Sequence, residues 1–296
     1  MNLIVGASGL LGSEICRILL ESGKPVRALV RATTDTAKQE RLRSLGAELA
    51  FGDLKDPATL AAATKGVSTI ISTASSTFSR QTGDSIETVD LQGQINLVDS
   101  AKTAGSGHFI FISFPPMAED FALQRSKRAV EEHLMRSGLA YTILQPTFFT
   151  EVWLSPAVGF DAANARAQIY GPGKNRISWI SFLDVAKFAA DCVGNPGTRN
   201  MAIQLGGPQA LSPLEVVKVF EELSGRSFAL THVPEDALKA QKAAATNSLD
   251  EAFSALMIAY AQGNVIDMGP AFRIFPQLRS GLSSVKDHAK RTLSLA

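Results

Sequence analysis

The stretch Asn2-Leu3-Ile4-Val5-Gly6-Ala7-Ser8-Gly9-Leu10-Leu11-Gly12 decides the fold class of this 296-residue chain. An apolar run typical of a buried strand leads directly into glycines spaced GxxGxxG, and an amphipathic helical pattern follows. Glycines in such a turn let the backbone approach the pyrophosphate of a dinucleotide, which rests on the amides of the helix N-terminus. An ordinary strand-to-helix turn is the alternative. The residues expected to contact a cofactor here are Gly6, Ser8, Gly9, Leu10, Leu11 and Gly12.

Short apolar runs alternate with amphipathic stretches up to residue 145. Strands are predicted at Leu3–Val5, Val26–Val30, Leu49–Phe51, Thr69–Ser72, Phe109–Ile112 and Thr142–Leu144. Helices are predicted near residues 10–22, 36–44, 57–64, 85–104 and 120–137. Because strand–helix units connect with right-handed crossovers, the pattern predicts an α/β fold with a Rossmann-type, doubly wound parallel sheet over residues 1–146.

The pattern changes after Pro146, where we expect a smaller α+β substrate-binding part over residues 147–296, with segments that return to the first sheet. Its predicted strands are Arg176–Ile180, Met201–Leu205 and Phe228–Val233. Capping-box patterns at residues 181–184 and 212–215 predict two helix starts, and two Ala-rich helices end near Gln262. The polar stretch Ser75–Ser85 is expected to form a mobile loop at the carboxyl edge of the sheet, where ligands bind in this architecture.

Composition excludes several function classes. With 29 basic and 28 acidic residues the formal net charge is +1, and no run of like charges indicates a nucleic-acid or anionic-membrane partner. The chain has no apolar stretch of about 18 residues and no evident leader, so we expect a cytoplasmic protein, monomeric or homodimeric, that acts on a small molecule. Cys16 and Cys192 sit in apolar helical patterns typical of buried thiols, and four scattered histidines predict no metal site.

Arg31 stands at the end of the second predicted strand, where NAD-binding proteins carry an acidic residue for the ribose 2′-hydroxyl. An arginine there favours the 2′-phosphate of NADP(H), because its planar fork binds phosphate through two hydrogen bonds. Lys38 and Arg27 are candidates for additional positive charge. A carboxylate in the same loop, Asp35, supports the opposite interpretation, NAD(H) binding.

Other residues at strand ends are candidate cofactor contacts. They are Asp53 and Leu54 after the third strand, Thr73 and Ala74 after the fourth, and Pro146 after the sixth. Plain turn residues would look much the same, so these assignments rest on position alone.

Lys127 lies within an apolar helical stripe, with Leu123, Val130 and Leu134 on the same face. A lysine in such a stripe either extends to the surface or directs its charge at the reacting centre. We expect Lys127, with Ser113 after the fifth strand, to act near the nicotinamide.

The motifs together resemble those of the atypical short-chain dehydrogenases of the NmrA-like group, which includes NADPH-dependent quinone reductases and is related to isoflavone-type reductases. The matching segments are Gly6–Gly12, Leu29–Arg31, Gly52–Leu54, Val89–Asp90, Asn96–Leu97, Phe111–Ser113, Ser126–Lys127, Tyr141–Pro146, Trp179–Ser181 and Asp184–Ala186. One departure is clear: Leu123 stands where the Tyr-x-x-x-Lys pair of typical short-chain dehydrogenases has its tyrosine.

The resemblance implies an NADPH-dependent reductase that transfers hydride to a quinone or another conjugated carbonyl compound, with Lys127 matching the lysine of the isoflavone-type reductases. Phe114, Phe148 and Trp153 are the expected substrate contacts, although aromatic residues in such places are more often core. The missing tyrosine motivates an alternative, a non-catalytic NADP(H) sensor of the NmrA type. An epimerase or dehydratase of nucleotide-sugars ranks lower for the same reason.

Overall fold

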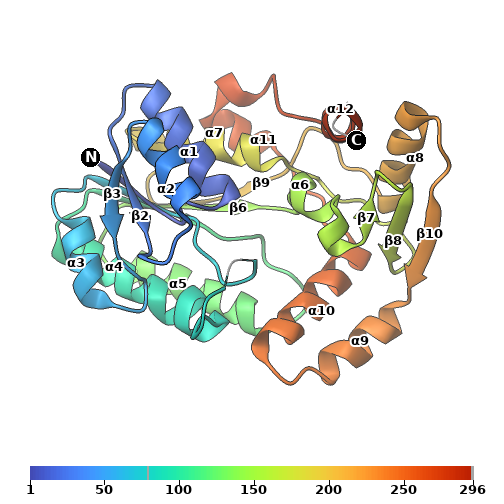
Figure 1. Ribbon diagram of the computed structural model, residues 1–296, viewed down its shortest axis with the longest axis horizontal. Helices are drawn as coiled ribbons and strands as arrows, with labels where there is room; N and C mark the ends of the chain where they lie inside the picture. Colours follow the sequence, from blue (N-terminus) through green and yellow to red (C-terminus); the bar gives the residue numbers. More distant parts are fainter. Residues whose placement is uncertain (79, 295–296) are drawn as a thin grey trace. The chain divides into compact units, whose positions relative to one another are not determined.

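The computed structural model describes residues 1–78 and 80–294, so Ser79 of the predicted loop and the last two residues of the chain lie outside the described residues. The chain forms two compact units, shown in sequence colours in Figure 1. The first contains residues 1–114, 122–145 and 185–203, and the second contains residues 115–121, 146–184 and 204–296.

The first unit is built on a seven-stranded sheet of order β3-β2-β1-β4-β5-β6-β9. Its strands are β1 (Asn2–Val5), β2 (Val26–Val30), β3 (Glu48–Phe51), β4 (Thr69–Ser72), β5 (His108–Ile112), β6 (Tyr141–Pro146) and β9 (Met201–Leu205). All pairings from β3 through to β6 are parallel. The order reverses direction between β1 and β4, which is the point where doubly wound sheets bind ligands.

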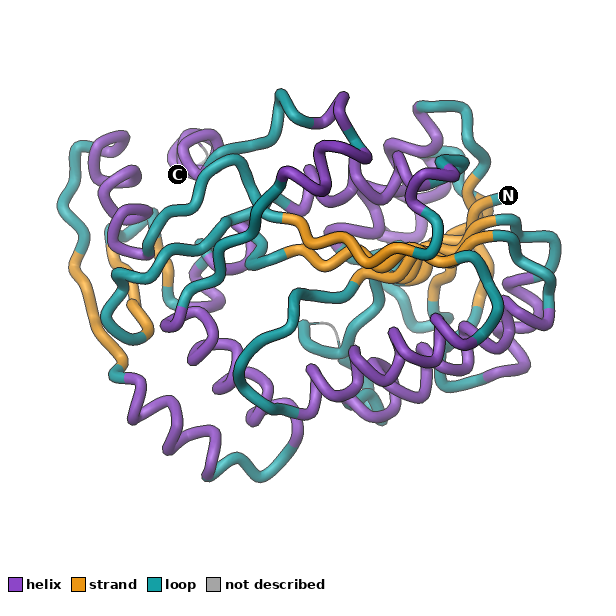
Figure 2. The backbone as a smooth tube through the Cα atoms, turned by 180° about the vertical axis from the view of Figure 1, so that it is seen from behind, coloured by secondary structure: helices purple, strands orange, loops and turns teal. Residues whose placement is uncertain are grey.

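Helices cover both faces of this sheet, as the purple segments above and below the orange strands in Figure 2 show. They are α1 (Leu10–Glu21), α2 (Thr36–Ser44), α3 (Pro57–Thr64), α4 (Gln94–Thr103), α5 (Ala122–Arg136) and α7 (Phe182–Cys192). Because both faces are covered, strands β1, β4 and β5 are buried along their whole length, and their Val, Ile, Leu and Phe side chains form the core. The predicted α/β fold is confirmed.

The helix predicted near residues 85–104 is divided in two. It begins with a π-helical segment, η1 (Ile86–Gly93), and continues as α4. Ser85 and Thr88 form a reciprocal capping box at its start. The wider π turn places the Asp90 side chain in the interior, where the site described below uses it.

The second unit contains a three-stranded sheet of order β10-β8-β7, with β7 at Phe160–Asp161, β8 at Arg166–Tyr170 and β10 at Ala229–Val233. Its helices are α6 (Thr150–Trp153), α8 (Pro213–Ser224), α9 (Glu235–Ala243), α10 (Ser248–Gln262), α11 (Gly269–Ile274) and α12 (Val285–Ser294), and its 3₁₀ turns are η2 (Pro156–Val158) and η4 (Pro276–Leu278). A further 3₁₀ turn, η3 (Pro196–Thr198), belongs to the first unit. The predicted capping box at Ser212 and Glu215 is confirmed.

The strand predicted at Arg176–Ile180 is wrong. Ile177 forms isolated bridges to Leu211 and Asn264, and Ile180 forms one to Phe149, so no neighbouring segment runs alongside for a continuous ladder. The apolar run instead buries its side chains, with Trp179 only 1% exposed. Conversely, β7 and β8 were not predicted. These strands have only two and five residues, with little alternation of apolar and polar side chains, so their sequence signal is weak.

Other expectations concern the whole chain. In the part that the structure describes, no helix is both long and apolar enough to cross a membrane, and no group of three or more His, Cys, Asp or Glu side chains could hold a metal ion. Cys16 and Cys192 are free and buried, and burial raises the pKa of each thiol to about 12.

Candidate dinucleotide-binding site

The glycine turn after β1 requires glycine at two of its positions. Gly6 has a φ of +82°, and a Cβ there would lie 2.5 Å from Thr73 Oγ1. A Cβ on Gly12 would lie 2.2 Å from the carbonyl oxygen of Gly6, so only glycine allows α1 to start this close to the turn. Among the residues that the structure describes, no side chain caps the first turn of α1. Its amides therefore remain available to an anion, as a pyrophosphate site requires.

A pocket open to solvent lies beside this turn, at the carboxyl ends of β1, β2 and β3, with about 430 Å³ of space that includes open solvent. It is lined by Val5, Gly6, Ser8, Leu29, Val30, Arg31, Gly52, Asp53, Leu54, Ala74 and Val89. The pocket thus combines apolar walls with the glycine turn and with Arg31 among its polar lining. This arrangement fits the adenosine half of a dinucleotide.

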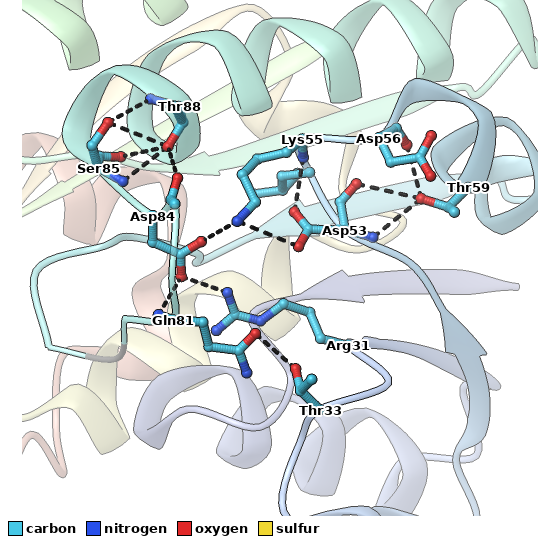
Figure 3. A network of polar contacts seen from close by, with 12 residues as sticks. Arg31, Thr33, Asp53, Lys55, Asp56, Thr59, Gln81, Asp84, Ser85 and Thr88 are labelled. Atoms are coloured by element: carbon cyan, nitrogen blue, oxygen red, sulfur yellow. Dashed lines mark hydrogen bonds and ion pairs between the residues drawn. The ribbon is translucent and has the colours of Figure 1, made fainter.

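Figure 3 shows a network of charges around Arg31. The Arg31 guanidinium donates to Asp84 Oδ2 at 2.5 Å, and the Lys55 ammonium donates to Asp84 Oδ1 at the same distance. Asp53 Oδ2 lies 3.7 Å from the Lys55 ammonium. Burial acts to raise the pKa of Asp84, but the hydrogen bonds from Lys55 and Arg31 outweigh it and lower the pKa below its ordinary value.

The other charged residues predicted near the 2′-phosphate have different roles. The Asp35 carboxylate accepts a hydrogen bond from the backbone N–H of Lys38 and caps α2. Arg27 stands near the amino end of β2, where it pairs with Glu48 and donates to the carbonyls of Ala63 and Lys65. Arg27 is therefore excluded from the site. Lys38 is exposed on α2.

Sequence reasoning did not identify Lys55 or Asp84. Lys55 comes two residues after Asp53, at the carboxyl edge where ligand-binding residues gather, and this position was an available signal. Asp84 gave no such signal. It is 53 residues from Arg31 in the sequence, and the path of an irregular loop brings the two side chains into contact.

The predicted contacts at the other strand ends all lie at this edge. Asp53 and Leu54 line the pocket, and so does Ala74. Thr73 turns its hydroxyl back to donate to the Val5 carbonyl at 3.1 Å, which holds the glycine turn against β4. Pro146 is buried at the end of β6.

Lys127 is buried on α5 with a side chain that is 7% exposed. Its ammonium lies 3.7 Å from Asp90 Oδ1, 3.4 Å from the Ile112 carbonyl oxygen and 4.8 Å from the centre of the Phe111 ring. Burial lowers the pKa of Lys127, and the carboxylates of Asp90 and Glu131 oppose this effect. Asp90 Oδ2 in turn accepts hydrogen bonds from the backbone and hydroxyl of Ser76. The pair therefore links α5 to the segment after β4.

The neighbouring Arg128 reaches the segment after β5. Its guanidinium donates to Ser113 Oγ at 2.9 Å and to the Phe114 carbonyl, and it pairs with Glu131 at 2.9 Å. Glu131 also accepts from the Gln145 side chain. A buried chain of polar groups thus fixes Ser113. Sequence reasoning missed Arg128. Arg128 directly follows Lys127 on the helix, and adjacent residues of a helix ordinarily point in different directions.

The three predicted substrate contacts differ in environment. Phe114 is partly buried, with its ring 5.6 Å from the Arg128 guanidinium carbon. In the second unit, Phe148 is 4% exposed and belongs to the core. Trp153 is partly buried, packs edge-on against Phe148 and stacks on Tyr260.

Comparison with known proteins identifies the family. An NAD(P)H azoreductase of Xenophilus azovorans is 34% identical over 229 residues, which cover 76% of this chain and 74% of that protein. The photosystem II assembly factor Ycf39 of Guillardia theta is 33% identical over 234 residues, covering 78% and 73%.

A solved structure extends the similarity to the fold of nearly the whole chain. The NADPH-dependent quinone oxidoreductase QOR2 of Escherichia coli, complexed with NADPH, matches with a TM-score of 0.78 and 20% identity over 99% of this chain and 100% of that one. The model of the NmrA-like family matches residues 2–269. The chain therefore belongs to the NmrA-like family, as its motifs predicted.

Proposed function

We propose that this protein is an NADPH-dependent reductase that transfers hydride to a quinone, an azo compound or another conjugated acceptor. The observation that carries the proposal is the phosphate-binding turn beside a pocket containing Arg31, at the reversal point of the sheet. The NAD(P)H azoreductase relative, similar over three quarters of both chains, supports the reaction class.

The residues present fit NADP(H). The α1 amides and the glycine turn would hold the pyrophosphate, Arg31 and Lys55 the 2′-phosphate, and the apolar lining the adenosine. When bound, the cofactor supplies a hydride from its nicotinamide ring. Asp53, Leu54, Thr73 and Ala74 are the further proposed contacts at the same edge, and Lys38 and Pro146 remain proposals on position alone.

The chain lacks the tyrosine of the Tyr-x-x-x-Lys pair. The position four residues before Lys127 is Leu123, which is 4% exposed and packed in the core. Reduction of a quinone adds one hydride and one proton to give the hydroquinone, and reduction of an azo bond adds the same pair to give the hydrazine. Without that tyrosine, Lys127 would stabilise the developing negative charge or deliver the proton, with Ser113 beside the reacting centre.

The substrate contacts and wider organisation belong to the same proposal. Phe114, Phe148 and Trp153 would contact the acceptor, with residues 1–146 binding the cofactor and residues 147–296 the substrate. We propose a cytoplasmic enzyme, monomeric or homodimeric.

The experiment is oxidation of NADPH, and separately of NADH, against a panel of azo dyes, quinones and enones, with binding of both cofactors titrated in parallel. We expect acceptor-dependent oxidation that is faster with NADPH at limiting cofactor. Tight binding of NADPH without oxidation by any acceptor would refute the reductase and indicate a cofactor sensor. Turnover of nucleotide-sugars would refute it in favour of an epimerase or dehydratase.

A further inference from the structure

The two cations beside the adenosine pocket are already neutralised by carboxylates of the protein. Asp84 contacts both Arg31 and Lys55 at 2.5 Å, and Asp53 lies 3.7 Å from Lys55. Two positive and two negative side chains leave no net positive charge in this cluster. A 2′-phosphate brings a charge of about −1.5 to −2 at pH 7, so it meets a cluster whose cations already have anionic partners.

Asp84 is held in this position from several sides. The Gln81 backbone N–H donates to Asp84 Oδ2 at 2.9 Å. The Gln81 side-chain oxygen accepts a hydrogen bond from the hydroxyl of Thr33, which lies two residues after Arg31. The Thr88 hydroxyl donates a hydrogen bond to the carbonyl oxygen of Gly83, the residue directly before Asp84. The Asp84 side chain is 1% exposed, whereas its partners Arg31 and Lys55 are 26% and 27% exposed, so the carboxylate is buried and the two cations keep contact with solvent. These hydrogen bonds hold the Asp84 carboxylate in contact with both Arg31 and Lys55 (Figure 3).

We propose that Asp84 competes with the cofactor's 2′-phosphate for Arg31 and Lys55, and so sets the preference between NADPH and NADH. The 2′-phosphate of NADPH has either to displace the Asp84 carboxylate from a cation or to share that cation's remaining N–H donors with it. NADH carries a hydroxyl at this position and binds without that competition. The inference rests on the proposed function only for the identity of the cofactor, and it requires no hydride acceptor for its test.

The test is calorimetric titration with adenosine 2′,5′-bisphosphate and with 5′-AMP, which differ only in the 2′-phosphate. The variants are Asp84→Asn, which keeps the shape and removes the charge, and Asp99→Asn, an equal charge change at an exposed carboxylate that pairs with His133. We expect Asp84→Asn to tighten bisphosphate binding about tenfold and to change 5′-AMP binding less than about twofold, while Asp99→Asn changes neither. Equal effects on both ligands, or weaker bisphosphate binding, would overturn the inference.

A second set of variants separates competition from simple repulsion. In an Arg31→Met/Lys55→Met background the cations are gone, so adding Asp84→Asn should change bisphosphate binding less than about twofold. A full tenfold effect there would overturn the inference, because Asp84 would then act on the phosphate directly. Retained 5′-AMP binding reports that each variant keeps its pocket. If the unaltered protein binds both ligands and Asp84→Asn has no effect, only this inference fails; if it binds neither, the proposed cofactor site fails with it.

Discussion

The Lys127 ammonium lies 3.7 Å from Asp90 Oδ1, and both side chains are buried in the first unit. Lys127 is the residue proposed to act at the reacting centre, and its ammonium is also one half of a buried ion pair. Removing one partner of such a pair leaves an uncompensated charge in the interior. A change at Lys127 therefore affects both stability and turnover, and an experiment has to separate the two.

Replacing Lys127 with Met should lower the free energy of unfolding by about 3 kcal/mol and reduce turnover more than about tenfold. The double variant Lys127→Met/Asp90→Asn removes both charges, and the amide oxygen of Asn can still accept from Ser76. We expect it to regain most of the stability but none of the turnover, measured by urea unfolding and acceptor reduction. Recovery of turnover together with stability would show that Lys127 is only structural.

Gly12→Ala should weaken cofactor binding without unfolding the protein. The new Cβ would lie 2.2 Å from the Gly6 carbonyl oxygen, so α1 and the turn must separate and the phosphate-binding amides shift. We expect NADPH affinity to fall more than about tenfold by fluorescence titration, a loss of about 1.4 kcal/mol or more. Gly107→Ala is the control, because its Cβ meets only Ser68 O at 3.5 Å. Equal affinities of the two variants would exclude the turn as the phosphate site.

The Asp35→Ser variant distinguishes between helix capping and ribose binding as the role of the Asp35 carboxylate. Serine caps helices as well as aspartate does, so the variant should keep its stability, whereas Asp35→Ala should lose about 1 kcal/mol from α2. Since Asp35 caps the helix, we expect neither variant to change NADH affinity. Weaker NADH binding in the serine variant would show instead that the carboxylate holds the ribose.

The buried His108 should make stability depend on pH between about 4 and 6.5. Burial, with a smaller contribution from Arg199, lowers its pKa from 6.5 to about 4. Within this window the unfolded chain binds a proton that the folded protein does not, so stability is full above pH 6.5 and falls as the pH approaches 4. The loss is on the order of 3 kcal/mol.

The measurement is urea unfolding of the unaltered protein and of His108→Gln, which can still bond to Thr142, at several pH values. The difference in unfolding free energy between the two proteins should shrink steadily from pH 6.5 to pH 4. Parallel curves would mean that His108 becomes protonated without penalty in the folded state.

The parts of the fold that depend on local pattern could be predicted from the sequence. The β2 strand and the α2 and α3 helices have the predicted bounds, because apolar runs, capping residues and Pro57 mark them locally. The bridges of Ile177 could not be predicted, because they depend on which distant segments pass beside it.

The same distinction applies to the site. Gly6 and Gly12 reveal themselves by spacing, and Arg31 by its place at a strand end. The partners of these residues do not: Asp84 reaches Arg31, and Asp90 reaches Lys127, only through the paths of the segments after β4. The sequence thus predicts Arg31 and Lys127 as candidate site residues, and the structure adds Lys55 and the carboxylates that contact these cations.

The most direct test of hydride transfer is a single turnover with NADPH deuterated at both C4 positions of the nicotinamide, using whichever acceptor of the panel is reduced fastest. Because a C–H bond of the cofactor breaks in the proposed step, we expect acceptor reduction to be several-fold slower than with ordinary NADPH. Bound NADPH that reduces no acceptor, or reduction at the same rate with both cofactors under conditions where chemistry limits, would contradict the proposal.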